Sequence, residues 1–192
     1  MSYSTRVLTS TNNYKITAHI NNKNNNNKCI ITFGEIDSKL TETGFASDLI
    51  MKEGDDHIYV AQKTWTQYQY LSREDSYKII RDEITGKEVY TYGSSLGAYC
   101  AIYYGTAINA HILALSPRIP AHPIINKLMG NVFKNEGFHH KELNVIKKQY
   151  KSLHVFYDKN NYIDNYYVNI FIKPAFRSAN YYHVEHAGHY TA

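Results

Sequence analysis

One short segment of the sequence has the residue types and spacing that a nucleophile requires. Residues 93–97 read Gly-Ser-Ser-Leu-Gly, with Ser95 at the centre of a Gly-x-Ser-x-Gly pattern, between the strand-like run EVYTY and the small, apolar run AYCAIYYG. A sharp strand-to-helix turn lifts the serine hydroxyl out of a sheet, and it needs glycine at both flanking positions, where a side chain would collide with neighbouring backbone. Ser95 is therefore the candidate nucleophile, and the amide of Leu96 is a candidate oxyanion donor.

The elements that must position Ser95 alternate along the sequence. Strand-like and helix-like segments follow one another over residues 28–33, 43–54, 57–62, 72–85, 88–93, 95–107, 110–116, 135–151, 152–158, 165–176 and 179–186. This alternation predicts a mostly parallel sheet between two helical layers, a three-layer α/β/α fold. Residues 1–27 are expected to add an antiparallel hairpin and an asparagine-rich loop, so that residues 1–192 form a single domain.

The element order and the elbow resemble the α/β-hydrolase superfamily over about residues 28–189. This resemblance implies that a serine, an acid and a histidine follow one another along the chain. His189, which follows Gly188 after the last strand-like run, stands where the family has its base. His186 is the second choice for the base, and His183 is expected to lie within the strand.

Two aspartates stand where the family has its acid, in the segment DKNNYID after the strand-like run SLHVFY. Asp158 ends that strand, whereas Asp164 precedes the next helix. The family acid commonly lies a few residues past the strand and shortly before a helix, which favours Asp164 and leaves Asp158 as the alternative. Asp158 is also suited to capping the turn, and an aspartate before a helix is often simply its N-cap.

Two more features follow other strand-like runs, at the sheet edge where such folds carry their chemistry. The resemblance implies a second oxyanion donor after the first parallel strand, and the candidates are the amides of Gly34, Glu35 and Ile36. The glycine-rich HGGG run of lipases is absent there. Trp65, the only tryptophan, follows the run at 57–62 and either lines a substrate pocket or packs against the protein.

The composition argues against several other kinds of protein. The net charge of +4 is spread along the chain, without the clustered basic patch of a nucleic-acid binder. No apolar run approaches the roughly 20 residues that span a bilayer, and the N-terminus lacks a signal-peptide core. Cys29 and Cys100 make neither a disulfide framework nor a zinc site and lie in apolar segments, so a reducing cytoplasm is expected.

Together these residues predict a serine hydrolase that cleaves an ester or related acyl bond through an acyl-enzyme, with a small-molecule or glycan acyl ester as substrate. The spacing of residues 183, 186 and 189 does not place three imidazoles on one face of a strand, so no metal and no organic cofactor is expected. Two alternatives stay open. One is an acyltransferase that uses a glycan or another hydroxyl in place of water. The other is a catalytically silent module of the same fold, with a link to surface-polysaccharide assembly. An exposed sheet edge would support a homodimer.

Overall fold

The computed structural model describes residues 2–23, 27–133 and 137–189 of the 192-residue chain. Residues 24–26 of the asparagine-rich loop therefore lie outside the described residues. The strands are β1 (Tyr3–Ser10), β2 (Tyr14–Asn21), β3 (Lys28–Phe33), β4 (Asp56–Gln62), β5 (Glu88–Ser94), β6 (Ala110–Leu115), β7 (Tyr150–Tyr157) and β8 (Asn180–His183). The helices are α1 (Ser47–Glu53), α2 (Arg73–Ile84), α3 (Leu96–Gly105), α4 (Pro123–Leu128), α5 (Tyr162–Tyr167), a π-helical turn η1 (Val168–Ile172) and α6 (Lys173–Ala175).

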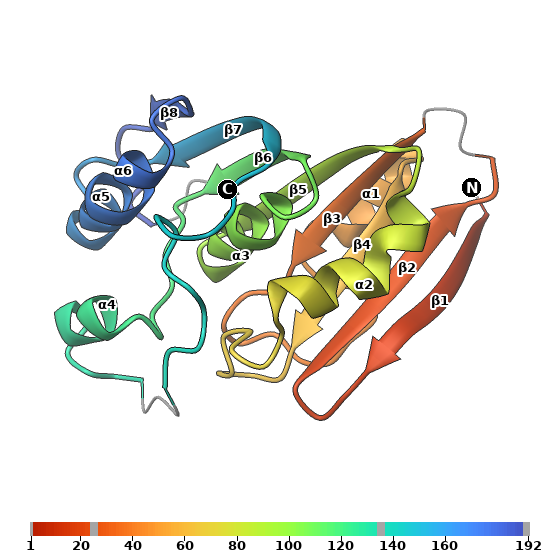
Figure 1. The fold of residues 1–192 in the computed structure, drawn as a ribbon, viewed down its shortest axis with the longest axis horizontal. Helices are drawn as coiled ribbons and strands as arrows, with labels where there is room; N and C mark the ends of the chain where they lie inside the picture. Colours follow the sequence, from red (N-terminus) through yellow and green to blue (C-terminus); the bar gives the residue numbers. More distant parts are fainter. Residues whose placement is uncertain (1, 24–26, 134–136, 190–192) are drawn as a thin grey trace.

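Over these residues the strands form one eight-stranded sheet in the order β1-β2-β4-β3-β5-β6-β7-β8. The strands from β3 to β8 pair in parallel, whereas β1 and β2 form an antiparallel hairpin that joins the sheet through β4. Helices α2 and α3 lie on the near face of the sheet in Figure 1, and α1 lies on the far face. The predicted α/β fold with a mostly parallel sheet and an N-terminal hairpin is confirmed.

Strand β4 and helix α3 are enclosed on every side, whereas the central strands β5 and β6 keep some partly exposed residues, such as Leu113. Every residue of β4 and every residue of α3 is buried. A helix that is hydrophobic all round must be covered on every side. Helix α3 packs on β3, β5 and β6, and its Tyr99, Tyr103 and Tyr104 contact the ring of the buried His140. Cys29 and Cys100 are both buried and unpaired, as the apolar segments around them indicated.

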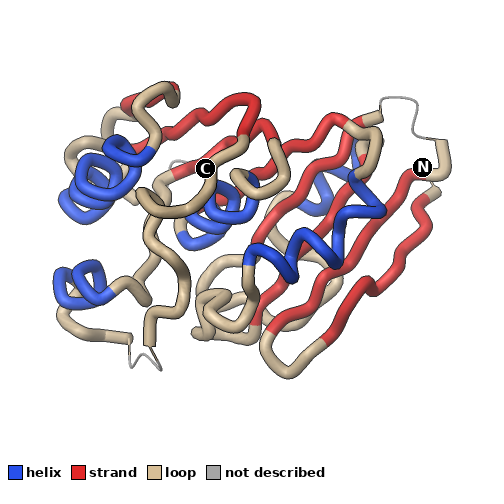
Figure 2. The backbone as a smooth tube through the Cα atoms, viewed as in Figure 1, coloured by secondary structure: helices blue, strands red, loops and turns tan. Residues whose placement is uncertain are grey.

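The predicted helix over residues 135–151 is wrong. Residues 137–149 form turns and loops, drawn in tan in Figure 2, and β7 begins at Tyr150. The helical spacing of apolar residues is real, because Leu143 and Ile146 are both buried. Backbone groups of this segment instead bond to its neighbours: Gln149 N donates to Thr106 O, and Lys147 O accepts from the guanidinium of Arg73.

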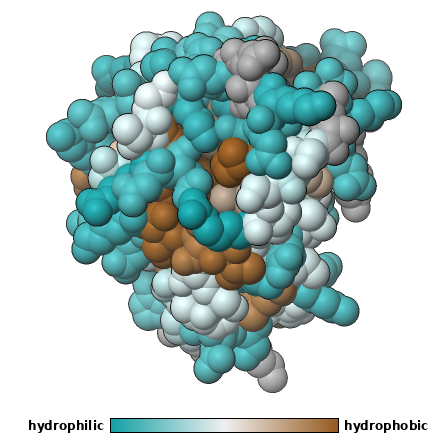
Figure 3. Space-filling model, turned by 90° about the vertical axis from the view of Figure 1, so that its right-hand side faces the viewer, coloured by the Kyte–Doolittle hydropathy of each residue, from teal (hydrophilic) through white to brown (hydrophobic). Residues whose placement is uncertain are grey.

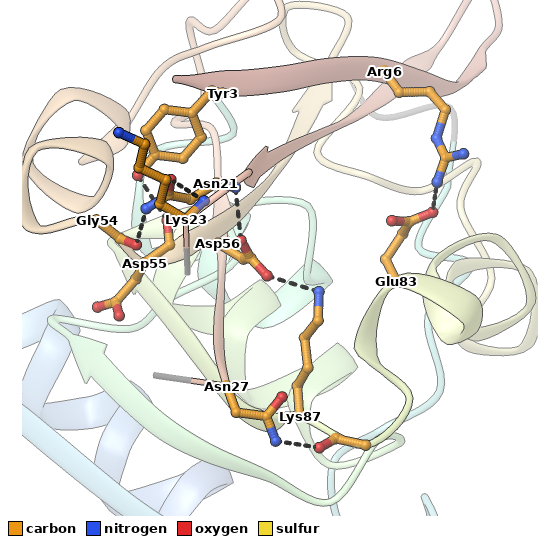
Figure 4. A network of polar contacts seen from close by, with 11 residues as sticks. Tyr3, Arg6, Asn21, Lys23, Asn27, Gly54, Asp55, Asp56, Glu83 and Lys87 are labelled. Carbon is orange, nitrogen blue, oxygen red and sulfur yellow. Dashed lines mark hydrogen bonds and ion pairs between the residues drawn. The ribbon is translucent and has the colours of Figure 1, made fainter. Parts of the chain in front are cut away.

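A polar network fixes the hairpin at the amino-terminal ends of the parallel strands (Figure 4). Asp56 is 2% exposed and binds the Lys87 ammonium at 2.7 Å and the Asn21 backbone amide at 2.8 Å. Arg6 of β1 pairs with Glu83 of α2, which secures the outer strand of the hairpin to the helical layer.

From the side of the hairpin, the surface of the protein is mostly hydrophilic, with a smaller hydrophobic group near the centre of the view (Figure 3). In the described part of the chain, no helix is both long and apolar enough to cross a membrane.

Candidate active site

Ser95 occupies a strained turn between the end of β5 at Ser94 and the start of α3 at Leu96. Its backbone has φ 54° and ψ −118°, a conformation that costs a residue with a side chain roughly 1–3 kcal/mol. Hydrogen bonds hold the turn in place: Ser95 N donates to Leu115 O at 2.9 Å, and Ser95 O accepts from Ala98 N at 3.1 Å. The turn raises the serine side chain at the carboxyl end of the sheet, as the elbow pattern predicted.

The two glycines of the pattern have a direct steric reason. A Cβ atom at Gly93 would collide with the carbonyl group of Gly97, and one at Gly97 would lie 2.7 Å from Phe33 O at the end of β3. Both contacts involve backbone, which cannot swing aside as a flexible side chain can. The elbow therefore brings the end of β3 close to the start of α3, and glycine is needed at both positions.

His189 lies between Ser95 and Asp164 and is within hydrogen-bond distance of both. The Nε2 atom is 2.8 Å from Ser95 Oγ, and the Nδ1 atom is 2.8 Å from Asp164 Oδ2. The Asp164 side chain is fully buried, whereas that of His189 is 17% exposed. A carboxylate accepts only from a protonated nitrogen, so it directs the proton of neutral His189 to Nδ1 and leaves Nε2 to accept from the serine hydroxyl.

Asp164 lies within the first turn of α5 and does not cap it. The N-cap is Asn161, whose side chain accepts from Asp164 N at 3.1 Å. The second carboxylate oxygen, Oδ1, lies 3.4 Å from an Arg118 nitrogen in the loop after β6. The guanidinium places a positive charge beside a buried carboxylate, which compensates part of the cost of burying that charge. Of the candidate acids, Asp164 is the one that faces His189.

Asp158 instead holds the loop that carries His189. Its Oδ2 accepts from Gly188 N at 2.9 Å, and its Oδ1 accepts from Asn160 N at 2.8 Å and faces His183 Nε2 at 3.3 Å. These hydrogen bonds, first from Asn160 and then from Gly188, lower the pKa of the Asp158 carboxyl below its usual value. The alternative of Asp158 as the acid that orients His189 does not fit this geometry, because its oxygens bond to other groups.

The other two C-terminal histidines lie away from the serine. His183 ends β8 and faces Asp158, and His186 is exposed in the following turn with φ 59°. Among the described residues, no group of three or more His, Cys, Asp or Glu side chains is placed to hold a metal ion.

The candidate oxyanion donors differ in their availability. The Leu96 amide begins α3, where helical amides have no intrahelical acceptor, and among the described residues it donates no recorded hydrogen bond. The Gly34 amide is occupied, since it donates to Val60 O at 3.1 Å, which corrects the prediction for that residue. Gln62 Nε2 donates to Glu35 O at 2.8 Å. Across a trans peptide the N–H points opposite to the carbonyl, so the Ile36 amide points away from Gln62. The backbone amides of Glu35 and Ile36 therefore remain as the candidates for the second oxyanion donor.

Trp65 lies in the loop after β4 and is 53% exposed. Its ring contacts that of Phe133 at a centroid distance of 5.3 Å, and it lines a hollow of about 220 Å³. Neither Ser95, His189 nor Asp164 lines that hollow. Trp65 therefore packs on a neighbour and lines a hollow, and its role in a substrate pocket stays a prediction.

Two residues near the candidate triad could be recognised only in the structure. Arg118 stands in a proline-rich stretch whose sole sequence signal is its position after β6, at the edge where polar groups gather. The anchoring of Gly188 by Asp158 had no sequence signal, because it joins residues 30 positions apart through a backbone amide.

Comparison with solved structures finds proteins of similar architecture. An α/β hydrolase enzyme from a Medee basin deep-sea metagenome library is similar to this chain at a TM-score of 0.63 and 12% identity, with 98% of this chain and 83% of that chain covered. The chain has the α/β-hydrolase fold. Est1E from Butyrivibrio proteoclasticus matches at a TM-score of 0.62 and 12% identity, covering 98% of this chain and 91% of that one.

A third similar structure is an α/β serine hydrolase without a lid from Xanthomonas campestris. It matches at a TM-score of 0.56 and 11% identity, with 98% of this chain and 86% of that chain covered. No model of a known protein family matches the sequence, and a search of curated proteins found no match. The similarity therefore lies in the α/β-hydrolase fold, as the elbow and the element order indicated.

Proposed function

We propose that this protein is a serine hydrolase that cleaves an acyl ester with Ser95 as nucleophile, His189 as base and Asp164 as the acid that orients it. The observation that carries the proposal is the continuous chain of two 2.8 Å contacts from a buried carboxylate through an imidazole to a serine on a strained turn. Strain of this kind persists where the surrounding structure enforces it, and it is typical of functional sites.

The first half of the reaction forms an acyl-enzyme. Ser95 Oγ attacks the acyl carbon while its proton moves to His189 Nε2, and the carbonyl π electrons move onto the carbonyl oxygen. That oxyanion is stabilised by the Leu96 amide at the helix N-terminus and by the amide of Glu35 or Ile36. The bond to the leaving oxygen then breaks, and imidazolium His189 donates its proton to the departing alcohol.

The second half reverses these roles with water. Water adds to the acyl carbon, His189 accepts its proton, and the bond to Ser95 Oγ breaks as the proton passes back to the serine. Asp164 stabilises the imidazolium that forms twice per cycle. Arg118, on the other carboxylate oxygen, keeps Asp164 oriented toward His189.

The structural neighbours support a reaction of this class. The similar structures include Est1E and a lid-less serine hydrolase, each at 11–12% identity, so they support the activity only through the shared fold. The same acyl-enzyme would serve an acyltransferase, in which a hydroxyl acceptor replaces water in the second half.

The test replaces the nucleophile and uses its neighbour as a matched control. Ser95→Ala is expected to lower kcat/KM for 4-nitrophenyl acetate by about 10⁵-fold, because losing the nucleophile removes the covalent route. Ser94→Ala, one residue earlier in the same elbow, is expected to stay within about threefold of the parent, in line with its place outside the reacting chain.

A fluorophosphonate probe reports on the same serine without a chosen substrate. The parent and Ser94→Ala are expected to be labelled, and Ser95→Ala is not. If the folded parent resists labelling and hydrolyses no acyl ester, the silent-module alternative replaces the proposal. Transfer of the acyl group to an added glycan, at the expense of hydrolysis, would identify an acyltransferase.

A further inference from the structure

A preformed cavity lies at the carboxyl end of the sheet, in the loops that follow β4 and β6. It is the hollow of about 220 Å³ below Trp65, built by the loop at residues 63–70 with Ala121, Gly137 and His139. This volume is smaller than the roughly 300–1,000 Å³ of pockets for drug-sized ligands, and it suits a single ring.

Hydrogen bonds from outside the loop fix the walls of this hollow. Gln67 Oε1 accepts from Ala121 N at 2.5 Å, and Gln69 Oε1 accepts from His139 N at 2.7 Å. Three non-glycine residues of the loop, Trp65, Gln67 and Tyr68, have positive φ angles. Such conformations persist where the surrounding structure enforces them, so the hollow exists before a ligand arrives.

The lining of the hollow combines one aromatic face with neutral polar groups. Trp65 is half-exposed, and the side chains around it carry amides, hydroxyls, an imidazole and one ammonium: Asn13, Lys63, Thr64, Thr66, Gln67, Gln69, Tyr70 and His139. Among the lining residues that the structure describes, there is no carboxylate. A flat apolar surface ringed by hydrogen-bonding groups complements a ligand with C–H faces and a hydroxylated edge, which is the chemistry of a sugar ring.

Two contacts tie the hollow to the site of the proposed chemistry. Trp65 N donates to Ile36 O at 3.1 Å, so the tryptophan is joined directly to the candidate oxyanion loop. Arg118 N lies 3.3 Å from Ser95 O, and Ala121 follows it by three residues, a span of at most about 11 Å. The path from Ser95 O through Arg118 to Ala121, which lines the hollow, is therefore at most about 14 Å long.

We propose that this hollow binds one sugar ring of a glycan whose acyl ester is presented to Ser95. The assignment of the ester rests on the proposed function, whereas the binding of the sugar does not. Because no acidic residue lines the hollow, neutral and acidic sugars share this chemistry, and Lys63 is the residue that would separate them.

The first experiment uses the fact that Trp65 is the only tryptophan of the chain. Ser95→Ala protein, which cannot turn substrate over by the proposed route, is titrated with xylotriose, cellotriose, chitotriose and trigalacturonate while tryptophan emission is recorded. A saturable change with at least one of these sugars is expected, and His139→Ala in the same background is expected to weaken it at least fivefold. No saturable change with any sugar, or a change with benzoate alone, would overturn the proposal.

Lys63→Met decides which kind of sugar the hollow prefers. If trigalacturonate binds at least tenfold more weakly to this variant, and neutral sugars bind as before, the sugar ring is acidic. Equal binding of neutral sugars to parent and variant, with no preference for trigalacturonate, assigns a neutral ring. Both outcomes support a sugar site.

The second experiment links binding to turnover. Trp65→Ala is expected to lower kcat/KM for acetylated xylo-oligosaccharides at least tenfold, mainly through KM, and to lower that for 4-nitrophenyl acetate by a much smaller factor, because this small ester does not reach the hollow. Tyr77→Ala, which removes an exposed aromatic ring from α2, is the matched control and is expected to change neither. An equal loss on both substrates would contradict a sugar subsite.

The two proposals fail separately. A sugar-dependent change in emission together with the absence of Ser95-dependent ester hydrolysis would leave the sugar site and remove the serine hydrolase. Ser95-dependent hydrolysis without any sugar binding would do the reverse.

Discussion

A buried carboxylate lies at each end of the parallel strands. Comparing their partners distinguishes a carboxylate that stabilises the fold from one that is proposed to take part in the reaction. At the amino-terminal end, Asp56 is 2% exposed and bonds to Lys87 and the Asn21 amide (Figure 4). At the carboxyl end, Asp164 is fully buried, and its partners are His189 and Arg118. Only the second set includes an imidazole, a side chain that commonly serves as a general base.

Residues with positive φ occur at both ends of the sheet. At the carboxyl end, Ser95, Trp65, Gln67 and Ser116 all have positive φ. At the amino-terminal end, β3, β4 and β5 begin in regular parallel register. Positive φ at non-glycine residues is not confined to the carboxyl end, because Asn27 before β3 and Asn109 before β6 also have it. The contacts from Asp164 through His189 to Ser95 lie at the carboxyl end, where ligands bind in open α/β sheets, and the buried pair of Asp56 and Lys87 lies at the other end. Changes at the two ends should therefore affect different quantities.

Asp164→Asn is expected to produce the largest effect. The amide cannot hold the Nδ1 proton of His189 as a carboxylate does, so the tautomer that accepts from Ser95 is lost and kcat falls by about 10⁴-fold. The free energy of unfolding and the far-UV circular dichroism measure whether the fold persists. A loss of less than tenfold in a folded variant would show that Asp164 does not orient the base.

Lys87→Met tests the opposite end. Leaving Asp56 buried without its cation is expected to lower the free energy of unfolding by about 3 kcal/mol, at the lower end of the range for broken buried pairs because the Lys87 side chain is 19% exposed. Ester hydrolysis at a temperature where the variant is folded should match the parent.

The exposed pair Lys15–Glu42 provides the control for that measurement. Glu42 is 49% exposed, so Lys15→Met is expected to change stability by less than about 1 kcal/mol. If Lys87→Met lowered kcat at full folding, the separation between the two ends would be wrong.

The elbow was predictable from the sequence because its constraints are local. Gly93 and Gly97 are required by backbone contacts within and beside a single turn, and that requirement leaves a readable pattern. The sequence favoured Asp164 over Asp158 but left both open, because both lie in one segment, and only tertiary packing decides which carboxylate faces His189 and which faces Gly188.

The segment 137–149 shows the limit of periodicity. Leu143 and Ile146 have helical spacing and are buried, yet the chain folds as turns because backbone groups at Gln149 and Lys147 bond to α3 and α2 neighbours. Tertiary contacts outweigh the modest intrinsic preference for a helix in so short a segment. The shape of the hollow beside Trp65 could not be predicted from the sequence either, because positive φ at non-glycine residues has no sequence signature.

The pH dependence of the free energy of unfolding compares two buried histidines, His57 near the amino-terminal end of the sheet and His140 near its carboxyl end. Burial lowers the pKa of His140 to about 4 and that of His57 to about 3, below the ordinary 6.5. Between pH 6.5 and these values the unfolded chain binds protons that the folded chain does not, so stability falls as the pH falls through this window. Each histidine is expected to account for about 2 kcal/mol of the loss between pH 7 and pH 5.

Urea denaturation at the two pH values measures this loss in the parent and in His140→Gln and His57→Gln. Each glutamine variant is expected to be less stable than the parent at pH 7, because ring contacts are lost, but to lose about 2 kcal/mol less on acidification. Equal acid sensitivity in the parent and both variants would show that the pKa values of these histidines are the same in the folded and the unfolded chain.

Asp158→Asn is expected to produce the smallest effect and decides between the two candidate acids. The amide keeps one oxygen acceptor but faces either Gly188 N or Asn160 N with an NH₂ group, so the loop before His189 loosens without losing the base. The expected result is a fall of about tenfold in kcat at unchanged KM, about 1.4 kcal/mol in the barrier, with the rate of fluorophosphonate labelling reduced in proportion. Asp82→Asn on the exposed face of α2 is the control and should behave as the parent. A loss in Asp158→Asn as large as that in Asp164→Asn, in a folded protein, would mean that the loop rearranges in solution and that Asp158 serves as the acid.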